Sequence, residues 1–314
     1  MSSSMNPPVN PQPFHDGELR AHIEAGTGTP GFAIREMMPD QHRQFFSSLR
    51  FVMLATTDTD GWPVATIVTG PQGFISSDDP QSLRIAATAH WQESFTPLLD
   101  SDKAIGMLGI EFSTRRRNRV NGYVTAFDKD GLHVHVEQSF GNCPKYIQAR
   151  EVSNEMNDCL ESPREFFTDL NDAAKKIINH ADTFFVATAS GNEVMNGSGV
   201  DISHRGGMPG FIRIDGNTLT IPDFVGNRYF NTLGNMLVEP RAALLFIDFN
   251  TGDLLHLQGT TEVLWQSDET GNPVGAERLW RFHIKSAWIK SNAIPLQWTL
   301  REFAPTTENT GVWA

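Results

Sequence analysis

The feature that most constrains the fold is a pattern that occurs twice along the chain. Three short segments recur with one constant spacing, from Phe74 to Phe211, from Ile110 to Ile247 and from Gly122 to Gly259. Chance similarity among apolar strands is the alternative explanation, but the constant spacing favours an internal duplication. Two copies of one unit would pack as a pseudo-two-fold pair, and ligand sites commonly lie at such interfaces.

Each copy is predicted to consist mainly of short β-strands. A chain of 314 residues is long enough for two domains. Alternating and apolar runs separated by turn signals predict strands in the first half at Phe51–Thr56, Trp62–Val68, Leu83–Ala87, Ala104–Phe112, Arg119–Phe127 and Leu132–Gln138. The run Phe184–Ala189 repeats the first of them. This pattern is typical of a barrel-like α+β fold.

Helices are predicted between and before these strands. Helical periodicity occurs within Asp16–Leu49, and helices are also expected over Trp91–Leu99 and Lys145–Arg150. Ser162 resembles an N-cap that opens a helical linker to His180. We therefore divide the chain into an N-terminal arm with helices (1–48), a first barrel (49–150), a helical linker (151–182), a second barrel (183–302) and a tail (303–314).

Composition excludes several classes of protein. A net charge of −12 argues against a general nucleic-acid-binding surface. No apolar run reaches the roughly 18 residues that a membrane span needs. The segment Met1–Phe14 has the composition of a disordered arm rather than of a signal peptide, and two cysteines cannot form a disulfide framework. We expect a cytoplasmic protein with neither nucleic-acid nor membrane partners.

The segment Gly197–Asn235 has the composition of a binding site for a phosphate-bearing ligand. It combines a glycine-rich turn, predicted over Asp201–Phe211, with small polar residues and fixed positive charge. A helix is predicted to start at Asn227 and Arg228, where unpaired N–H groups and the helix dipole would favour a phosphate. A solvated helix cap and an ordinary turn are the alternative interpretations.

The second half resembles the pyridoxamine 5'-phosphate oxidase-like split β-barrel flavoproteins. The resemblance rests on the Val200–Phe211 run, on the Ile221-Pro222-Asp223 strand end with Gly226-Asn227-Arg228, and on the Val238–Phe246 segment. It covers roughly Thr183–Trp265, and Phe51–Gln138 matches more faintly. The Arg115–Gly122 and Gly141–Ile147 runs are similar to a tandem-barrel bacterial subgroup described as predicted flavin-nucleotide-binding proteins.

The resemblance implies two tandem split β-barrels with FMN bound at their interface. The positions that correspond to the phosphate-binding residues are Ser203, His204 and Arg205, followed by Asn227 and Arg228. The full predicted cofactor-binding set is Asp201, Ser203, His204, Arg205, Gly206, Asn227, Arg228, Asn231, Gln258, Arg115, Arg117, Arg119 and Asn121.

Several of these residues have two possible roles. Asp201 either faces the ligand or pairs with Arg205. Arg115, Arg117 and Arg119 share one face of a strand, so they either pair with this acidic protein's own carboxylates or complete the flavin site from the first barrel. Asn121 and Gln258 occupy equivalent positions and are candidates for contacts with the flavin ring edge.

The first barrel lacks the phosphate-binding residues. One residue is inserted between the repeated segments, since Leu83 and Ile85 match Leu219 and Ile221 at a spacing of 136. At that spacing Trp91 and Gln92 stand at the positions equivalent to Asn227 and Arg228, so we expect one FMN per chain. Cys143 is either a reactive thiol beside Lys145 or a buried structural cysteine. His133 and His135 have metal-ligand spacing without a third ligand, so no metal site is predicted.

The implied activity is that of an FMN-dependent oxidoreductase. Hydride transfer through the flavin would act on a small-molecule substrate or on NADH or NADPH, and no side chain is assigned as a catalytic acid or base. A flavin or haem carrier or sensor, and a structural tandem barrel with an empty site, are the alternatives. Homodimerisation is left open.

Overall fold

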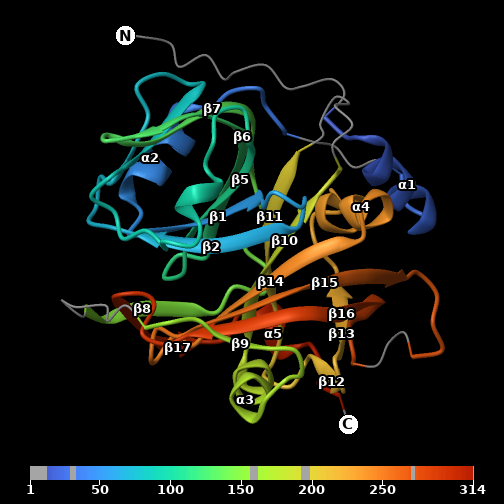
Figure 1. The fold of residues 1–314 in the computed structure, drawn as a ribbon. Helices are drawn as coiled ribbons and strands as arrows, with labels where there is room; N and C mark the ends of the chain where they lie inside the picture. The colour runs from blue at the N-terminus through green and yellow to red at the C-terminus, as the bar shows by residue number, and fades with distance from the viewer. Residues whose placement is uncertain (1–12, 29–32, 156–161, 192–198, 270–272, 314) are drawn as a thin grey trace.

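The computed structural model describes residues 13–28, 33–155, 162–191, 199–269 and 273–313. Within them, two antiparallel sheets dominate (Figure 1). The first contains β1 (Phe51–Thr57), β2 (Pro63–Thr69), β3 (Ile75–Ser76), β4 (Ser82–Ala86), β5 (Ala104–Glu111), β6 (Arg116–Asp128) and β7 (Gly131–Gly141). The second contains β10 (Thr183–Ala189), β11 (Val200–Gly206), β12 (Arg213–Asp215), β13 (Thr218–Phe224), β14 (Arg241–Ile247), β15 (Leu254–Leu264) and β16 (Ala276–Lys290).

The order of the strands confirms the duplication. The first sheet runs β2-β1-β5-β6-β7-β4-β3, and the second runs β11-β10-β14-β15-β16-β13-β12. Each strand of the first sheet therefore has a counterpart at the same place in the second. Both sheets are open paths rather than closed cylinders, as expected for split barrels. The short β9 (Glu165–Phe167) adds to β16, and β8 (Ala149–Glu155) pairs with β17 (Leu296–Glu302).

The repeated glycines mark equivalent β-bulges. The register of β6 against β7 shifts between Asn121 and Gly122, and that of β15 against β16 shifts between Gln258 and Gly259. A Cβ atom at Gly122 would lie 1.9 Å from the carbonyl oxygen of His135, and one at Gly259 would lie 2.3 Å from that of His283. Glycine is needed in both repeats because the neighbouring strand comes too close for a side chain.

A shared apolar layer joins the two repeats. Alternate residues of β1, such as Met53 and Ala55, face the other repeat, whereas Val52 and Leu54 enter the core of their own barrel. In β10, Phe185 and Ala187 belong to the shared layer. These strands read as continuous apolar runs because both of their faces are buried. The repeats therefore form a pseudo-dimer within one chain.

The helices of the described residues differ in part from those that the sequence predicted. They are α1 (Asp16–Glu24), α2 (Asp40–Ser48), α3 (Asp172–His180), α4 (Asn231–Val238) and α5 (Pro305–Glu308). The predicted helix over Trp91–Leu99 is wrong, since only a 3₁₀ turn forms at Thr96–Leu98, where Pro97 removes a backbone donor.

Two other helix predictions fail for tertiary reasons. The predicted helix over Lys145–Arg150 is wrong because Tyr146 has a left-handed φ of 62° and Ala149 begins β8. The linker helix begins at Asp172, capped by Asn171, rather than near Ser162. Phe166, which lies within the predicted helix, instead belongs to β9 and pairs with Trp288 on β16.

Residues 1–12 of the predicted disordered arm, Met1–Phe14, lie outside the described residues, and Pro13 and Phe14 are described. Phe14 is buried against the rings of His22 and Tyr229.

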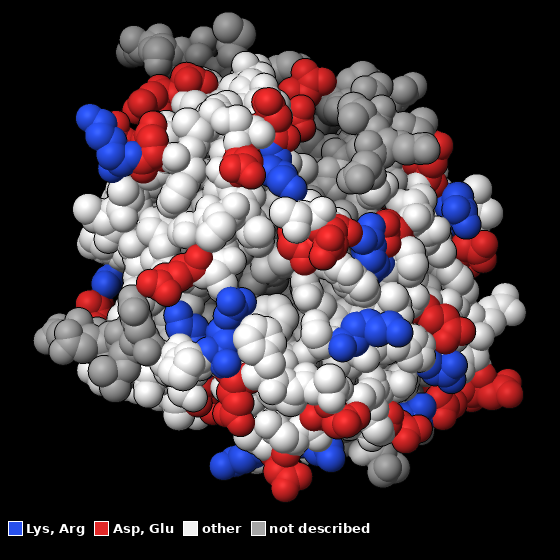
Figure 2. Space-filling view, in the orientation of Figure 1, with Lys and Arg blue, Asp and Glu red and all other residues white. Residues whose placement is uncertain are grey.

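Within the described segments, no helix is long and apolar enough to cross a membrane. Figure 2 shows acidic and basic side chains interspersed over one face of the molecule, without an extended basic surface.

Candidate functional site

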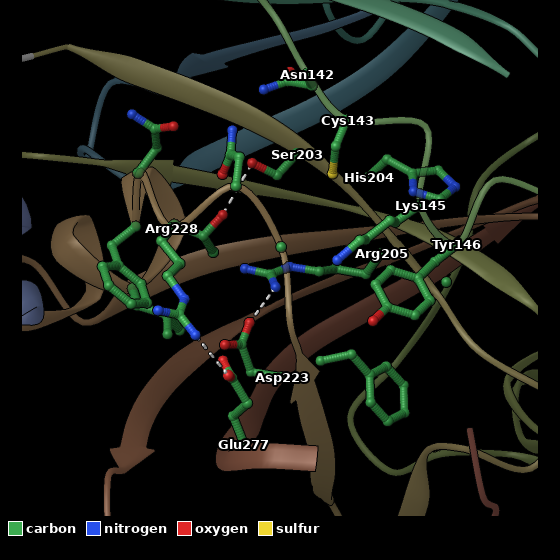
Figure 3. A pocket seen from close by; sticks show the side chains of 18 of the residues that line it. Asn142, Cys143, Lys145, Tyr146, Ser203, His204, Arg205, Asp223, Arg228 and Glu277 are labelled. Carbon is green, nitrogen blue, oxygen red and sulfur yellow. Dashed lines mark hydrogen bonds and ion pairs between the residues drawn. The ribbon is translucent and has the colours of Figure 1, made fainter. Parts of the chain in front are cut away.

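A cavity lies where the two repeats meet, and both repeats supply its walls (Figure 3). The first repeat contributes β6 and the segment 142–146 that follows β7. The second contributes the end of β11, the end of β13, the loop 226–230, the first turn of α4 and the start of β16. The site is therefore absent from either repeat alone.

Strand β11 carries four of the predicted residues to the cavity. Ser203, His204, Arg205 and Gly206 all line it. The expected glycine-rich turn over Asp201–Phe211 is partly wrong, because these residues pair with β10 as a strand and the chain turns only after Gly206. Pairing with the buried strand β10 fixes their positions more firmly than a surface turn would.

Arg205 is held by a carboxylate that the sequence prediction did not include. Its guanidinium donates to Oδ1 of Asp223, at the end of β13, and Oδ2 of the same carboxylate accepts from Arg278 at 2.5 Å. Both Asp223 and Arg278 are buried and line the cavity. Asp223 and Arg278 are far apart in the sequence, and the pairing of β13 with β16 brings them together.

The loop before α4 carries Asn227 and Arg228 into the cavity, but it is not the start of a helix. Arg228 and Phe230 have left-handed φ values of 61° and 58°, and α4 begins only at Asn231. The predicted helix start is therefore too early in the chain. Arg228 is half-exposed and lies 3.4 Å from the carboxylate of Glu277.

The N-terminus of α4 opens onto this cavity. Asn231, Thr232 and Leu233 line it, and no side chain caps the helix. The first N–H groups of a helix have no partner within the helix and carry its positive dipole end. This end of the cavity can therefore accept an anion.

Two arginines of the basic run on β6 reach the cavity. Nη1 of Arg117 lies 3.2 Å from Nδ1 of His204, and the guanidinium of Arg119 donates to Oγ of Ser203. Arg115 does not line the cavity: it precedes the strand and pairs with Glu302 at 2.7 Å. Arg116 lies over the ring of Phe45.

Asp201 and Asn121 lie behind the cavity wall instead of lining it. Arg119 donates to Oδ1 of Asp201 at 2.8 Å, and the amide of Asn121 donates to the same oxygen at 2.8 Å. Asp201 thus has a structural partner, but that partner is Arg119 rather than the predicted Arg205. Gln258 is also outside the cavity, where its amide donates to the carbonyl of Pro63 at 3.1 Å.

His204 is a buried, neutral imidazole with one unused donor. Burial lowers its pKa well below the usual value, and the positive charges of Arg117, Arg150 and Arg205 add to this effect. Because arginine only donates, Nδ1 of His204 accepts from Arg117 and the proton lies on Nε2. Nε2 is buried without a hydrogen-bond partner in the described part of the chain.

The segment after β7 brings a thiol, an ammonium and a phenol to the site. Sγ of Cys143 lies 3.6 Å from Nη2 of Arg117, and its intermediate exposure differs from that of a buried structural cysteine. Lys145 has no ion-pair partner among the described residues. Tyr146 donates to the carbonyl of Val225 at 3.1 Å, and burial raises its pKa to about 12, with Cys143 and Asp223 contributing.

Positive charge dominates the cavity. Its lining includes six cationic side chains, Arg117, Arg119, Lys145, Arg205, Arg228 and Arg278, and two carboxylates, Asp223 and Glu277. This excess occurs in a chain whose net charge is −12. Such a concentration of guanidinium groups suits a phosphate or another anionic group.

In the first repeat, the segment after β16 contacts Gln92, the residue that is equivalent to Arg228 of the second repeat. Gln92 donates to the carbonyl of Ala293 at 2.7 Å and accepts from Lys290 at 3.1 Å, while Nε2 of His90 lies 2.9 Å from the same carbonyl. The segment after β16 thus occupies the place that would be a second site.

No group of three or more His, Cys, Asp or Glu side chains is arranged to hold a metal ion in the described residues. Nε2 of His133, one of the two histidines with metal-ligand spacing, lies 3.6 Å from Oδ1 of Asp128.

Comparisons with known proteins match both halves of the chain to one family. Residues 38–157 and 170–291 each match the family model described as pyridoxamine 5'-phosphate oxidase. None of the curated proteins that were searched matches the sequence.

Solved structures match at low identity. They include HupZ of Group A Streptococcus, which is 15% identical, with a TM-score of 0.30 and coverage of 41% of this chain and 98% of HupZ. An FAD-binding protein from Mesorhizobium loti is 12% identical, with a TM-score of 0.28. The match covers 41% of this chain and 98% of the Mesorhizobium loti chain.

Proposed function

Because this chain belongs to the pyridoxamine 5'-phosphate oxidase family, we propose that it binds FMN in the cavity between its two repeats. The observation that carries the proposal is the excess of cationic side chains in a cavity that both repeats form. FMN combines a phosphate with a flat ring system, so it needs both a cationic end and a wall of packed side chains.

The residues present fit this cofactor. Arg205, Asn227, Arg228 and the uncapped first turn of α4 would hold the phosphate. The unpaired ammonium of Lys145 and the guanidinium of Arg117 are further donors for ring or ribityl oxygens.

We further propose that the protein is an FMN-dependent oxidoreductase. Bound FMN supplies hydride transfer, and the protein residues orient it, exclude water and stabilise its charge. The cavity carboxylates Asp223 and Glu277 are both in ion pairs with arginines, and the lone pair of the neutral His204 ring, on Nδ1, already accepts from Arg117. The cavity therefore offers no free carboxylate as a general base, which suits a reaction carried by the cofactor.

A flavin carrier or sensor is the second candidate, and the same lack of a free base favours it. Anaerobic mixing of the FMN-loaded protein with NADH or NADPH distinguishes the two. Bleaching of the flavin absorbance at a rate well above that of free FMN supports an oxidoreductase, whereas unchanged absorbance supports a carrier.

The purified protein is expected to bind one FMN per chain. Calorimetric titration of the flavin-free protein with FMN measures the stoichiometry directly. A single site is expected because Gln92 and the segment after β16 close the equivalent position. A protein that shows no heat of binding and no change in flavin fluorescence would overturn the proposal.

Replacing Arg228 with alanine is expected to raise the Kd for FMN about tenfold or more, because a charge-assisted hydrogen bond is lost. The matched control is Gln92→Ala at the equivalent position of the first repeat, which should leave the Kd nearly unchanged. Fluorescence titration of FMN with each variant measures both values. Equal effects of the two substitutions would contradict the assignment of the site to the second repeat.

A further inference from the structure

The N-terminal helix α1 packs closely against α4, the helix whose first turn lines the cavity (Figure 1). Two glycines allow the contact. A Cβ atom at Gly17 would lie 2.3 Å from the carbonyl oxygen of Gly234, and one at Gly234 would lie 2.7 Å from the backbone of Glu18. The backbones of the two helices therefore touch, and α1 can fix the position of α4.

Glu18 connects α1 to the first residue of α4. Its side chain is 2% exposed, and its Oε1 accepts a hydrogen bond from the amide of Asn231. Its other oxygen accepts from the backbone N–H of His15 at 2.9 Å, which closes a capping box on α1. Asn231 lines the cavity. One buried carboxyl group thus joins the N-terminal segment to the cavity wall.

His15 makes a second connection through buried polar groups. Its Nε2 lies 2.8 Å from Oδ1 of Asn235, whose amide donates to Oδ2 of Asp201 at 2.8 Å. Asp201 in turn pairs with Arg119, which reaches Ser203 on the cavity wall. The network therefore runs from α1, across α4 and β11, to β6 of the other repeat.

We propose that Glu18 and His15 are positioning residues of the flavin site, which hold Asn231 and the first turn of α4 in the orientation that accepts the phosphate. The inference rests on the proposed binding of FMN. It extends the site to a segment that precedes the whole first repeat in the sequence.

The charge state of Glu18 matters for this role. Burial raises its pKa well above the usual value, the negative charge of Asp201 adds to the rise, and Arg119 and the bonds from His15 and Asn231 oppose it. These are the groups that face Glu18 from α1, α4, β11 and β6. A neutral acid beside α4 leaves the positive helix end available to a phosphate, whereas an ionised one would repel it.

The first test compares Glu18→Ala with Glu24→Ala in the full-length protein. Glu24 is on the same helix but exposed, so it is the matched control. We expect Glu18→Ala to raise the Kd for FMN about tenfold, since Asn231 loses its orienting partner, and Glu24→Ala to leave it unchanged. Glu18→Gln keeps an acceptor for Asn231 and should recover most of the affinity.

The second test is a pH profile of the Kd for FMN in wild type and Glu18→Gln. As pH rises through the raised pKa of Glu18, the wild type gains a negative charge beside the phosphate, so its Kd should increase relative to that of Glu18→Gln. Taking the ratio of the two Kd values at each pH cancels the ionisation of the phosphate and of the other cavity groups. A merely structural contact would give a constant ratio.

The outcomes separate this inference from the proposed function. If wild type binds FMN and Glu18→Ala binds it as tightly as Glu24→Ala, the positioning role is overturned and the FMN proposal stands. If Glu18→Ala is weaker and Glu18→Gln does not recover, or the Kd ratio is flat with pH, the role is also overturned. If wild type binds no FMN, both proposals fall. Urea unfolding without flavin confirms that each variant is folded.

Discussion

Replacing Asp201 with alanine is expected to destabilise the protein by about 3–5 kcal/mol, because Arg119 would remain buried without its carboxylate partner. Asp201 accepts hydrogen bonds from Arg119, Asn121 and Asn235, each at 2.8 Å. The salt bridge joins β11 of one repeat to β6 of the other, so its loss should weaken the pseudo-dimer itself. Urea unfolding at neutral pH measures the change.

Two variants make this prediction specific. Asp215→Ala removes an exposed carboxylate from β12 and should change the free energy of unfolding by less than about 0.5 kcal/mol. The double variant Asp201→Ala with Arg119→Leu should recover part of the loss, since it removes both charges together. If Asp201→Ala unfolds at the urea concentration of Asp215→Ala, the ion pair does not stabilise the interface.

Replacing Gly122 with alanine is expected to destabilise the protein by about 3 kcal/mol through overpacking. The new methyl group would lie 1.9 Å from the carbonyl oxygen of His135, a backbone atom that cannot move without opening the bulge between β6 and β7. The same substitution at Gly259 should have a similar effect, because its methyl group would lie 2.3 Å from the carbonyl oxygen of His283. Thermal and urea unfolding measure both.

Gly28→Ala is the control for these two variants. A Cβ atom at Gly28 meets no atom of the described residues within 4 Å, so this substitution should be nearly neutral. If Gly122→Ala and Gly259→Ala were as stable as Gly28→Ala, the bulges would not need glycine. In that case the recurrence of Gly122 as Gly259, at the spacing shared by the other repeated segments, would have no structural reason.

Part of the candidate site was predicted through the family resemblance. Ser203, His204, Arg205, Asn227 and Arg228 all line one cavity, and their binding of FMN stays a prediction. Their secondary structure was less predictable. The β11 residues were assigned to a turn because glycines dominate the local signal, and Arg228 was placed in a helix although its backbone is left-handed.

For the basic run Arg115–Arg119, the local sequence pattern did not predict which side chains reach the cavity. Alternation along a strand placed Arg115, Arg117 and Arg119 on one face, but β6 begins only at Arg116, so Arg115 turns away toward Glu302. The cavity is also lined by four charged residues that were not predicted to bind: Lys145, Asp223, Glu277 and Arg278. They come from the segment after β7, from β13 and from β16, and only the pairing and packing of these segments brings them together.

The sequence by itself determined the duplication, the strand-rich fold and the segment that carries the second repeat's share of the site. It could do so because strand periodicity depends on neighbouring residues, and because a duplication is visible as similar segments at one spacing. Only the tertiary structure decided which charges meet, such as Arg119 with Asp201 and Glu18 with Asn231. Those partners are 82 and 213 residues apart, and their pairing depends on how the two repeats and α1 pack against one another.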